Sequence, residues 1–409
     1  MTPSTGTSGK RFRYLAKVQK GRLPTGGVVT TTDEGLPYLT MEYLRGAISE
    51  PAFVSAEPGL PIAEDGDLLL LWDGSNAGEF IRAKRGAVSS TVALVTPKAV
   101  DDGYFYWACK FLESQVRAET VGMGIPHVNG EVLANLVVPL PDAFGQRAIA
   151  DYLDREAARL DALVVAKERV LGLLAEKRRA LITRAVTRGL DPRAPIRDSG
   201  IPWLGEIPAH WRLERAKFVF RQSALPVRDE DEMVTCFRDG QVTLRRNRRE
   251  EGFTNANLEL GYQGIRAGQL VLHSMDAFAG AIGVSDSDGK CSPEYIICDP
   301  QTMQVDSYYY GHLLRSMALA GFIQASCPAV RERAPRIRFS DFGEMFVPVP
   351  PLGEQRSIVE RIRIDLSRLE AHRTANERTI ALLKERRATL IAATVTGLTC
   401  PPKSGPRRS

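Results

Sequence analysis

Two long stretches of the chain share one pattern of apolar and polar positions. From Gln146 to about Arg184 the apolar residues recur at steps of three, four and seven positions, and the stretch contains no proline and one glycine. A second stretch that begins at Gln355 carries the same stripe. Prolines precede both stretches, and Gly189 and Gly397 follow them. The pattern predicts two long amphipathic helices.

The two helical stretches belong to an internal repeat. Residues 138–187 align without a gap with residues 347–396 at a constant offset of 209 (355 − 146), and roughly 20 of the 50 aligned positions are identical. A period of about 200 residues is too long for a solenoid, so the repeated unit must be a domain plus a helix. The resulting pseudo-two-fold molecule suits a partner with two-fold character of its own, and duplex DNA is the obvious candidate.

The helices are too long to be buried in one small domain. About 40 helical residues span roughly 60 Å. We therefore expect them to pair as an antiparallel coiled coil that holds the two domains at a fixed distance; the alternative is that each helix packs only on its own domain.

Apolar runs bounded by glycines predict strands upstream of each helix. The aligned segments read as a buried strand, a glycine-bearing loop, a second strand and then a helical stretch: Gly66–Gly78 with Gly268–Gly280, Gly86–Leu94 with Gly289–Ile297, Tyr104–Trp107 with Ser307–Tyr310, and Ile125–Asn129 with Ala334–Arg338.

The fold class that follows is α+β, with two mixed α/β domains separated by the two helices in a pseudo-two-fold repeat. The boundaries that we expect are 1–140 for the first domain, 141–190 for the first helical region, 191–349 for the second domain with a linker at 191–212, 350–399 for the second helical region, and 400–409 for a disordered tail.

Composition and charge restrict the functional classes. The chain has 409 residues, and its net charge of +5 allows nucleic-acid binding without demanding it. Six cysteines lack C-x-x-C spacing, so we expect reduced, mostly buried thiols and no zinc site. No long apolar run and no signal-peptide stretch occur, which predicts a cytoplasmic protein that does not enter a membrane.

Basic residues cluster in both halves, which favours a phosphate-facing surface over merely solvated arginines. Aromatic residues near them (Trp72, Phe80, Phe237, Phe253, Phe278) could contact bases, although each is individually more typical of a core position. His127 is a further DNA-contact candidate because it aligns with Arg336.

Catalytic motifs are missing. The chain has neither a phosphate-binding G-x-x-x-x-G-K-[ST] loop nor a G-x-S-x-G nucleophile motif, and its five histidines lie far apart. The acidic runs Asp101-Asp102 and Asp229–Glu232 look like solvated loops and not like a metal cradle. We therefore expect no enzymatic activity and no cofactor in this chain.

Several motifs together resemble the specificity subunit of type I restriction–modification enzymes. They are VPLP…GQR and VPVPPLGEQR before the helices, EKRRALI and KERRATLI at their ends, the WDGS loop, the SPEYI strand and the segment GIPWLGEIPAHW. The resemblance covers nearly the whole chain, although Asp276-Ala277-Phe278 departs from the family's usual loop sequence.

The resemblance implies that each domain is a target recognition domain for one half of a bipartite, asymmetric site in double-stranded DNA. It also implies two modification subunits that use S-adenosylmethionine to methylate adenine, and two restriction subunits that use ATP and Mg²⁺. The candidate DNA-binding residues are Trp72, Asp73, Ser75, Arg82, Lys84, Arg85, His127, Arg245, Arg246, Arg248, Arg249, Asp276, Phe278, Arg336 and Arg338. The candidates for the coiled coil and for subunit docking are Gln146, Arg147, Leu153, Leu160, Leu174, Leu181, Gln355, Arg356, Ile362, Leu369, Leu383 and Leu390.

Three alternatives remain open. The chain could be the specificity subunit of a related enzyme whose methyltransferase and nuclease share one polypeptide. It could also be a coiled-coil scaffold that binds proteins and not DNA. A self-sufficient nuclease is disfavoured by the missing motifs.

Overall fold

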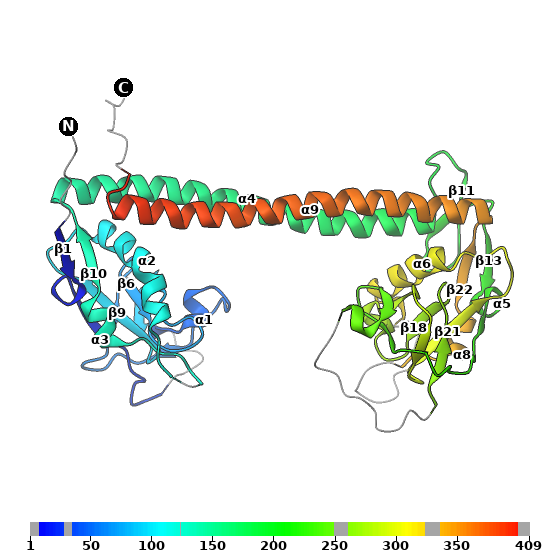
Figure 1. The fold of residues 1–409 in the computed structure, drawn as a ribbon, viewed down its shortest axis with the longest axis horizontal. Coiled ribbons are helices and arrows are strands. Elements are labelled where there is room, and N and C mark those ends of the chain that lie inside the picture. Colours follow the sequence, from blue (N-terminus) through cyan, green and yellow to red (C-terminus); the bar gives the residue numbers. More distant parts are fainter. Residues whose placement is uncertain (1–7, 28–34, 123, 249–260, 324–335, 400–409) are drawn as a thin grey trace. The chain divides into compact units, whose positions relative to one another are not determined.

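The computed structural model describes residues 8–27, 35–122, 124–248, 261–323 and 336–399. The chain divides into two compact units (Figure 1). The first comprises Met1–Glu168 with Glu377–Ser409, and the second comprises Arg169–Asn376. Each unit therefore contains one of the predicted recognition domains together with part of both long helices.

The first unit is built on an antiparallel sheet in the order β2-β9-β6-β7. Its central strand is a run of four buried leucines whose side chains alternate between two cores: Leu68 and Leu70 face α2, whereas Leu69 and Leu71 face the core that includes Leu39 of β3. The elements are β1 (Ser8–Arg11), η1 (Phe12–Tyr14), β2 (Ala16–Lys20), β3 (Leu36–Leu39), α1 (Met41–Leu44), β4 (Phe53–Val54), β5 (Ile62–Ala63), β6 (Leu68–Leu71), β7 (Phe80–Arg82), β8 (Gly86–Val88), β9 (Val92–Pro97), α2 (Asp102–Ala118), α3 (Gly130–Asn135), β10 (Val137–Leu140) and α4 (Ala143–Arg188).

The second unit repeats this sheet as β14-β21-β18-β19. Strand register is also repeated, since Leu70 lies opposite Ala93 and Leu272 lies opposite Ile296. The predicted frame of strand, loop and strand is thereby confirmed. The elements are β11 (Ile196–Asp198), β12 (Glu206–Pro208), β13 (Arg212–Arg215), α5 (Ala216–Val219), β14 (Phe220–Gln222), β15 (Val234–Cys236), β16 (Val242–Leu244), η2 (Arg245–Asn247), β17 (Gln263–Ile265), β18 (Leu270–His273), η3 (Ala277–Ala279), β19 (Ile282–Val284), β20 (Gly289–Cys291), β21 (Tyr295–Pro300), α6 (Ser307–Leu319), α8 (Phe339–Glu344), β22 (Phe346–Val349) and α9 (Leu352–Val395).

The helix that follows each sheet starts at a capping aspartate. Asp101 accepts a hydrogen bond from the backbone N–H of Tyr104 at the start of α2, and Asp306 does the same for Tyr308 at the start of α6. Asp101 therefore matches Asp306. The predicted alignment of Tyr104–Trp107 with Ser307–Tyr310 was wrong by two residues, because the loops before the caps differ in length.

Both long helices are confirmed, and each extends a few residues beyond the apolar stripe. The glycines that follow them adopt left-handed backbone conformations, with φ of +70° at Gly189 and +76° at Gly397. In the first unit, Arg387 of α9 lies 2.9 Å from Asp161 of α4, and Lys384 lies 3.4 Å from Glu168. The residue numbers run in opposite directions, so the helices pair antiparallel.

The ends of α4 and α9 also pack into the hydrophobic cores of the two units. Leu153 near the start of α4 and Val395 at the end of α9 lie in the core of the first unit. Val186 near the end of α4 and Ile358 near the start of α9 lie in the core of the second unit. The domain in each unit thus packs on both helices.

The segment predicted as a linker is folded. β11 and β12 form an antiparallel pair, Trp211 is fully buried in the core of the second unit, and its indole N–H donates to Glu354 at 3.0 Å. The prediction that Asp229–Glu232 form a solvated loop was wrong for Asp231. This residue is 7% exposed and accepts hydrogen bonds from Arg266 at 3.1 Å. The partly buried guanidinium of Arg266 offsets the cost of burying that carboxylate.

The described cysteines, Cys109, Cys236, Cys291 and Cys298, are all buried, as predicted. Cys327 and Cys400 lie outside the described residues. Within the described parts of the chain, no helix is long and apolar enough to cross a membrane.

Candidate nucleic-acid interface

A rigid loop leaves the end of the central strand in the first unit. The carbonyl oxygen of Trp72 accepts a hydrogen bond from the backbone N–H of Val128 at 2.9 Å, and the backbone N–H of Gly74 donates to Pro126 at 2.8 Å. These bonds fasten the predicted loop Trp72–Ser75 to the segment that carries His127, and leave Ser75 and His127 exposed. The structure therefore brings Trp72, Asp73, Ser75 and His127 together.

Lys20 belongs to the same surface. Its ammonium group lies 2.8 Å from the Asp73 carboxylate and 6.0 Å from the centre of the Trp72 ring. Trp72 is only partly buried, so its remaining surface is open beside this ion pair. The arrangement combines an aromatic face, a carboxylate acceptor and a cation, which are the groups that contact bases and phosphates.

The other predicted cations of this unit lie elsewhere. Arg82 pairs with Leu68 at the start of β6, whereas the Trp72 loop leaves its end. The guanidinium of Arg82 lies 4.4 Å from the ring of Tyr106, Lys84 lies 4.5 Å from the ring of Tyr43, and Arg85 pairs with Glu64 at 3.4 Å. These three residues are exposed, and each contacts a partner outside the Trp72 loop.

The second unit has an equivalent loop at the end of β18. Here the carbonyl oxygen of Ser274 accepts a hydrogen bond from the backbone N–H of Ile337 at 3.0 Å, the counterpart of the bond between Trp72 and Val128. His127 and Arg336, which precede these donors, therefore occupy matching positions, as their alignment predicts. Arg336 is exposed and pairs with Glu294 at 2.9 Å.

A cavity of about 610 Å³ opens beside this loop. Among its lining residues are Ser274, Arg336 and Arg338, with Gln222 from β14 and Tyr295 from β21. The ring centre of Tyr295 lies 4.8 Å from that of His273, and burial lowers the pKa of His273. The site is thus polar, open and large enough for a nucleotide base or sugar.

The turn that joins β15 to β16 contacts two more of the predicted loops, the one with Asp276 and the one with Arg248. Arg238 in this turn pairs with Asp276 at 2.9 Å, and Asp239 pairs with Arg248 at 2.7 Å. The guanidinium of Arg248 also lies 4.3 Å from the ring of Phe237. The loop with Asp276 and the loop with Arg248 are therefore linked.

Several predicted site residues have other surroundings. Phe80 is 1% exposed and belongs to the core. Phe278 is half-buried, Arg245 is partly buried, and Arg246 pairs with Glu232 at 2.6 Å. Phe253 and Arg249 lie outside the described residues. Much of the basic charge is thus already balanced by carboxylates that a phosphate would have to replace.

The candidates for the coiled coil and for docking divide by burial. Leu153, Leu160 and Ile362 are buried; Leu174, Leu181, Leu369, Leu383 and Leu390 are partly buried; Arg147 and Arg356 are exposed. Gln146 and Gln355 are buried and bond to their own domains, since each accepts a hydrogen bond at 2.8 Å from the backbone of the capping aspartate.

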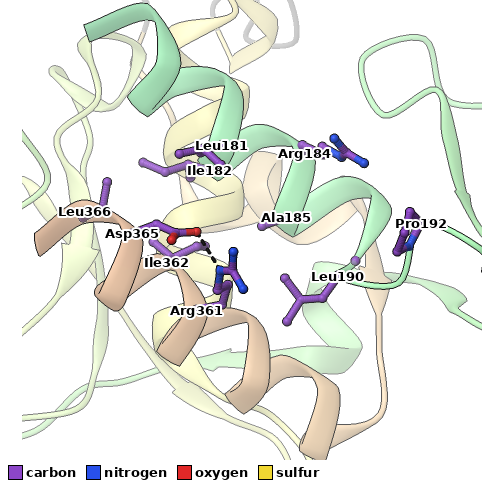
Figure 2. Close-up of a pocket in the computed structure, with 11 residues that line it drawn as sticks. Leu181, Ile182, Arg184, Ala185, Leu190, Pro192, Arg361, Ile362, Asp365 and Leu366 are labelled. Carbon is purple, nitrogen blue, oxygen red and sulfur yellow. Dashed lines mark hydrogen bonds and ion pairs between the residues drawn. The ribbon is translucent and has the colours of Figure 1, made fainter. Parts of the chain in front are cut away.

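Leu181 and Ile362 meet at an open cavity of about 230 Å³ between α4 and α9 in the second unit (Figure 2). Figure 2 also shows the ion pair of 2.8 Å between Arg361 and Asp365 on its border. Leu181 and Ile362 therefore line this cavity between the two helices.

Sequence reasoning missed four residues of the candidate interface. Lys20 stood among the N-terminal basic residues, so charge clustering offered a signal for it. Arg238, Gln222 and Tyr295 had no such signal, because they come from other strands and turns and reach the site only through the sheet order.

Comparison with known proteins shows that the first unit is similar to a described family of domains. Residues 11–164 match the family model of the type I restriction modification DNA specificity domain. The matched region runs from β1 through the sheet and the loops above into α4.

Two curated relatives and a solved structure extend the likeness. The specificity subunit of the type I restriction enzyme MjaVIII from Methanocaldococcus jannaschii is 34% identical over 211 residues, which cover 51% of this chain and 48% of that protein. The chain thus spans about half the length of this relative. The EcoDI specificity subunit from Escherichia coli is 23% identical over 376 residues, covering 85% of this chain and 78% of that protein. A chain in a structure of the assembly and conformational transition of a type I R-M system has a TM-score of 0.66 at 16% identity, covering 97% of this chain and 99% of that one.

Proposed function

Because the first unit matches the DNA specificity domain of type I restriction–modification enzymes, we propose that the chain is a specificity subunit of this family and recognises a bipartite, asymmetric sequence in double-stranded DNA. Each recognition domain reads one half of that sequence. In this proposal the chain directs adenine methylation and restriction by partner subunits and performs no catalysis itself.

The observation that carries the proposal is the pair of matched loops. In both units a loop leaves the same end of the same central strand and is fastened by an equivalent backbone hydrogen bond, from Val128 to Trp72 and from Ile337 to Ser274. The backbone frame is repeated while the exposed side chains differ, with His127 in one unit and Arg336 in the other. Two similar frames with different contact residues suit two different half-sites.

Charge and chemistry also favour DNA. The two surfaces offer an aromatic face at Trp72, the amide of Gln222 on β14 and a guanidinium at Arg336. Such groups bond to base edges and phosphates. The paired arginines give up intramolecular carboxylates for phosphates on binding, which predicts strong salt dependence.

The partners follow from the same proposal. Two modification subunits bring S-adenosylmethionine, two restriction subunits bring ATP and Mg²⁺, and the complex acts in the cytoplasm. We expect exposed positions of α4 and α9, including Arg147 and Arg356, to contact the modification subunits. The same features suit an enzyme whose methyltransferase and nuclease are fused, and the neighbouring genes distinguish the two arrangements.

The direct test expresses the chain with the methyltransferase encoded beside it in a host without adenine methylation. We expect a split, asymmetric motif to become methylated. Replacing Ser274 and Arg336 with alanine should relax or abolish one half of the motif and leave the other half unchanged. Equal loss at both halves would contradict the assignment of one half-site to each unit.

A further inference from the structure

A cavity lined by cations lies in the second unit, and its lining includes no residue of the loops of the candidate DNA interface. It holds about 170 Å³ between α4 and α6, and its lining includes Arg178, Arg179, His312 and Arg315. Its lining contains no carboxylate among the described residues. Three positive charges therefore share one small hollow.

Within the described parts of the chain these arginines are not paired with a carboxylate, although the charge of Asp239 acts on Arg315 from a distance. Among the ion pairs of the described residues, none includes Arg178, Arg179 or Arg315. Arg315 instead donates hydrogen bonds to two neutral carbonyl oxygens, those of Gly280 and Arg238, both at 3.2 Å. These bonds hold the guanidinium in place without neutralising it.

The pKa of His312 reflects the same excess of positive charge. Burial, together with the charges of Arg315 and Arg178, lowers the pKa of His312 to about 4, while Asp306 opposes this shift. An imidazole at this position is therefore neutral near pH 7. A bound anion would favour its protonated form.

The equivalent place in the first unit is neutralised by the chain itself. The caps Asp101 and Asp306 and the helix repeat match His312 with Trp107, Arg315 with Lys110 and Arg178 with Arg387. There Lys110 pairs with Glu113 at 2.5 Å and Arg387 pairs with Asp161 at 2.9 Å. The buried indole of Trp107 donates to Asp154 at 2.8 Å.

The second unit lacks two of these three carboxylates and keeps the cations. Ala318 stands at the position of Glu113, and Arg363 stands at the position of Asp154. Glu370 matches Asp161 but bonds to Arg373 on its own helix at 2.7 Å. In the first unit, carboxylates of the chain therefore pair with the cations at this place. In the second unit, the cavity lining supplies no such carboxylate among the described residues.

We propose that the cavity lined by Arg178, Arg179 and Arg315 is a binding site for a phosphate-class oxyanion. Guanidinium groups match phosphate oxygens through paired N–H donors, and the hydroxyl groups of Thr183 and Ser316 line the same cavity. This inference goes beyond the proposed function, because it requires no contact with a DNA sequence.

The test titrates inorganic phosphate into the full chain by calorimetry at constant ionic strength. Arg178→Gln is the informative variant, because Arg178 is exposed and forms no hydrogen bond or ion pair among the described residues, so folding should persist. We expect saturable binding that weakens roughly tenfold or more in this variant. Arg169→Gln is the matched control, since it removes the same charge from an exposed position of the same helix, and it should bind like the parent.

A second readout places the anion. Histidine-selective NMR should show that phosphate raises the pKa of His312 in the parent chain and in Arg169→Gln, with a smaller effect in Arg178→Gln. Weak, non-saturable binding, or an equal effect in all three proteins, would overturn the proposal.

Competition with duplex DNA identifies the source of the phosphate group. If DNA displaces the bound phosphate, the group belongs to the DNA backbone; if both bind together, it belongs to a small phosphate compound. Either outcome retains an oxyanion site. Absence of phosphate binding with intact DNA recognition would defeat this inference alone, whereas phosphate binding without DNA recognition would defeat only the proposed function.

Discussion

At the scale of single residues, one buried glutamine in each unit fastens the domain to the long helix that follows it. Gln355 accepts a hydrogen bond from the backbone N–H of Asp306 and donates to the carbonyl oxygens of Gln304 and Pro350. Gln146 bonds in the same way to Asp101 and Pro141. Because both glutamines occur in the repeat, the sequence marks them as candidates for the coiled coil or for docking. It does not predict their hydrogen bonds to the capping aspartates, which lie more than 40 residues away along the chain.

Replacing Gln355 with leucine should destabilise the second unit by about 2–4 kcal/mol, because three buried or part-buried hydrogen bonds to backbone groups would be lost. Denaturant unfolding measures this loss. Arg356→Gln, which changes the exposed neighbour, should stay within about 0.5 kcal/mol of the parent. Equal effects in the two variants would contradict the role given to Gln355.

His312 predicts how stability depends on pH. Its folded-state pKa of about 4 lies below the ordinary value of 6.5, so the unfolded chain binds more protons between these two values. Stability should therefore be complete above pH 6.5 and should fall by about 2–3 kcal/mol as the pH decreases to 4. His312→Gln should remove this part of the pH dependence, whereas His372→Gln, on an exposed part of α9, should retain it.

At the scale of elements, periodicity predicted both helices and the central strands because burial there is periodic or continuous. It could not predict which ends of the strands share a surface. Arg82 follows the Trp72 loop by only a few residues, yet strand pairing places it at the other end of β6. It also could not show that Trp211, in a segment with linker composition, is a core residue.

The burial of the helix ends yields a prediction at this scale. Ile362 of α9 is 3% exposed and packs in the core of the second unit, so Ile362→Ala should cost about 2–4 kcal/mol. Leu382→Ala on the same helix, at a residue 55% exposed, should change stability by less than about 0.5 kcal/mol. Thermal and denaturant unfolding of the two variants would show whether the apolar stripe is buried unevenly along the helix.

At the scale of the whole molecule, the repeat explains why one chain has two similar frames with different surfaces. The matched backbone hydrogen bonds at Trp72 and Ser274 keep the frame, while Trp107 and His312 show how far matched positions have diverged. The sequence predicted the duplication and the family. It could not predict all residues of the candidate interface, because different strands and turns bring their side chains together.

Helix length offers a test of the proposed bipartite recognition. Four residues inserted after Glu168 in α4, with four after Asn376 in α9, add about one turn and about 6 Å to each helix. If the helices set the spacing of the half-sites, the gap in the recognised sequence should widen by about two base pairs, with both half-sites unchanged. Substituting four residues at the same places without insertion is the control. An unchanged gap would show that helix length does not set the spacing.

The most direct test of the central claim is a single-molecule map of adenine methylation. The host, which lacks adenine methylation, would carry the neighbouring methyltransferase gene either with this chain or without it. We predict that a split, asymmetric motif is methylated only when this chain is present. An active methyltransferase that gives no such motif, or the same motif without this chain, would contradict its role as the subunit that recognises the DNA sequence.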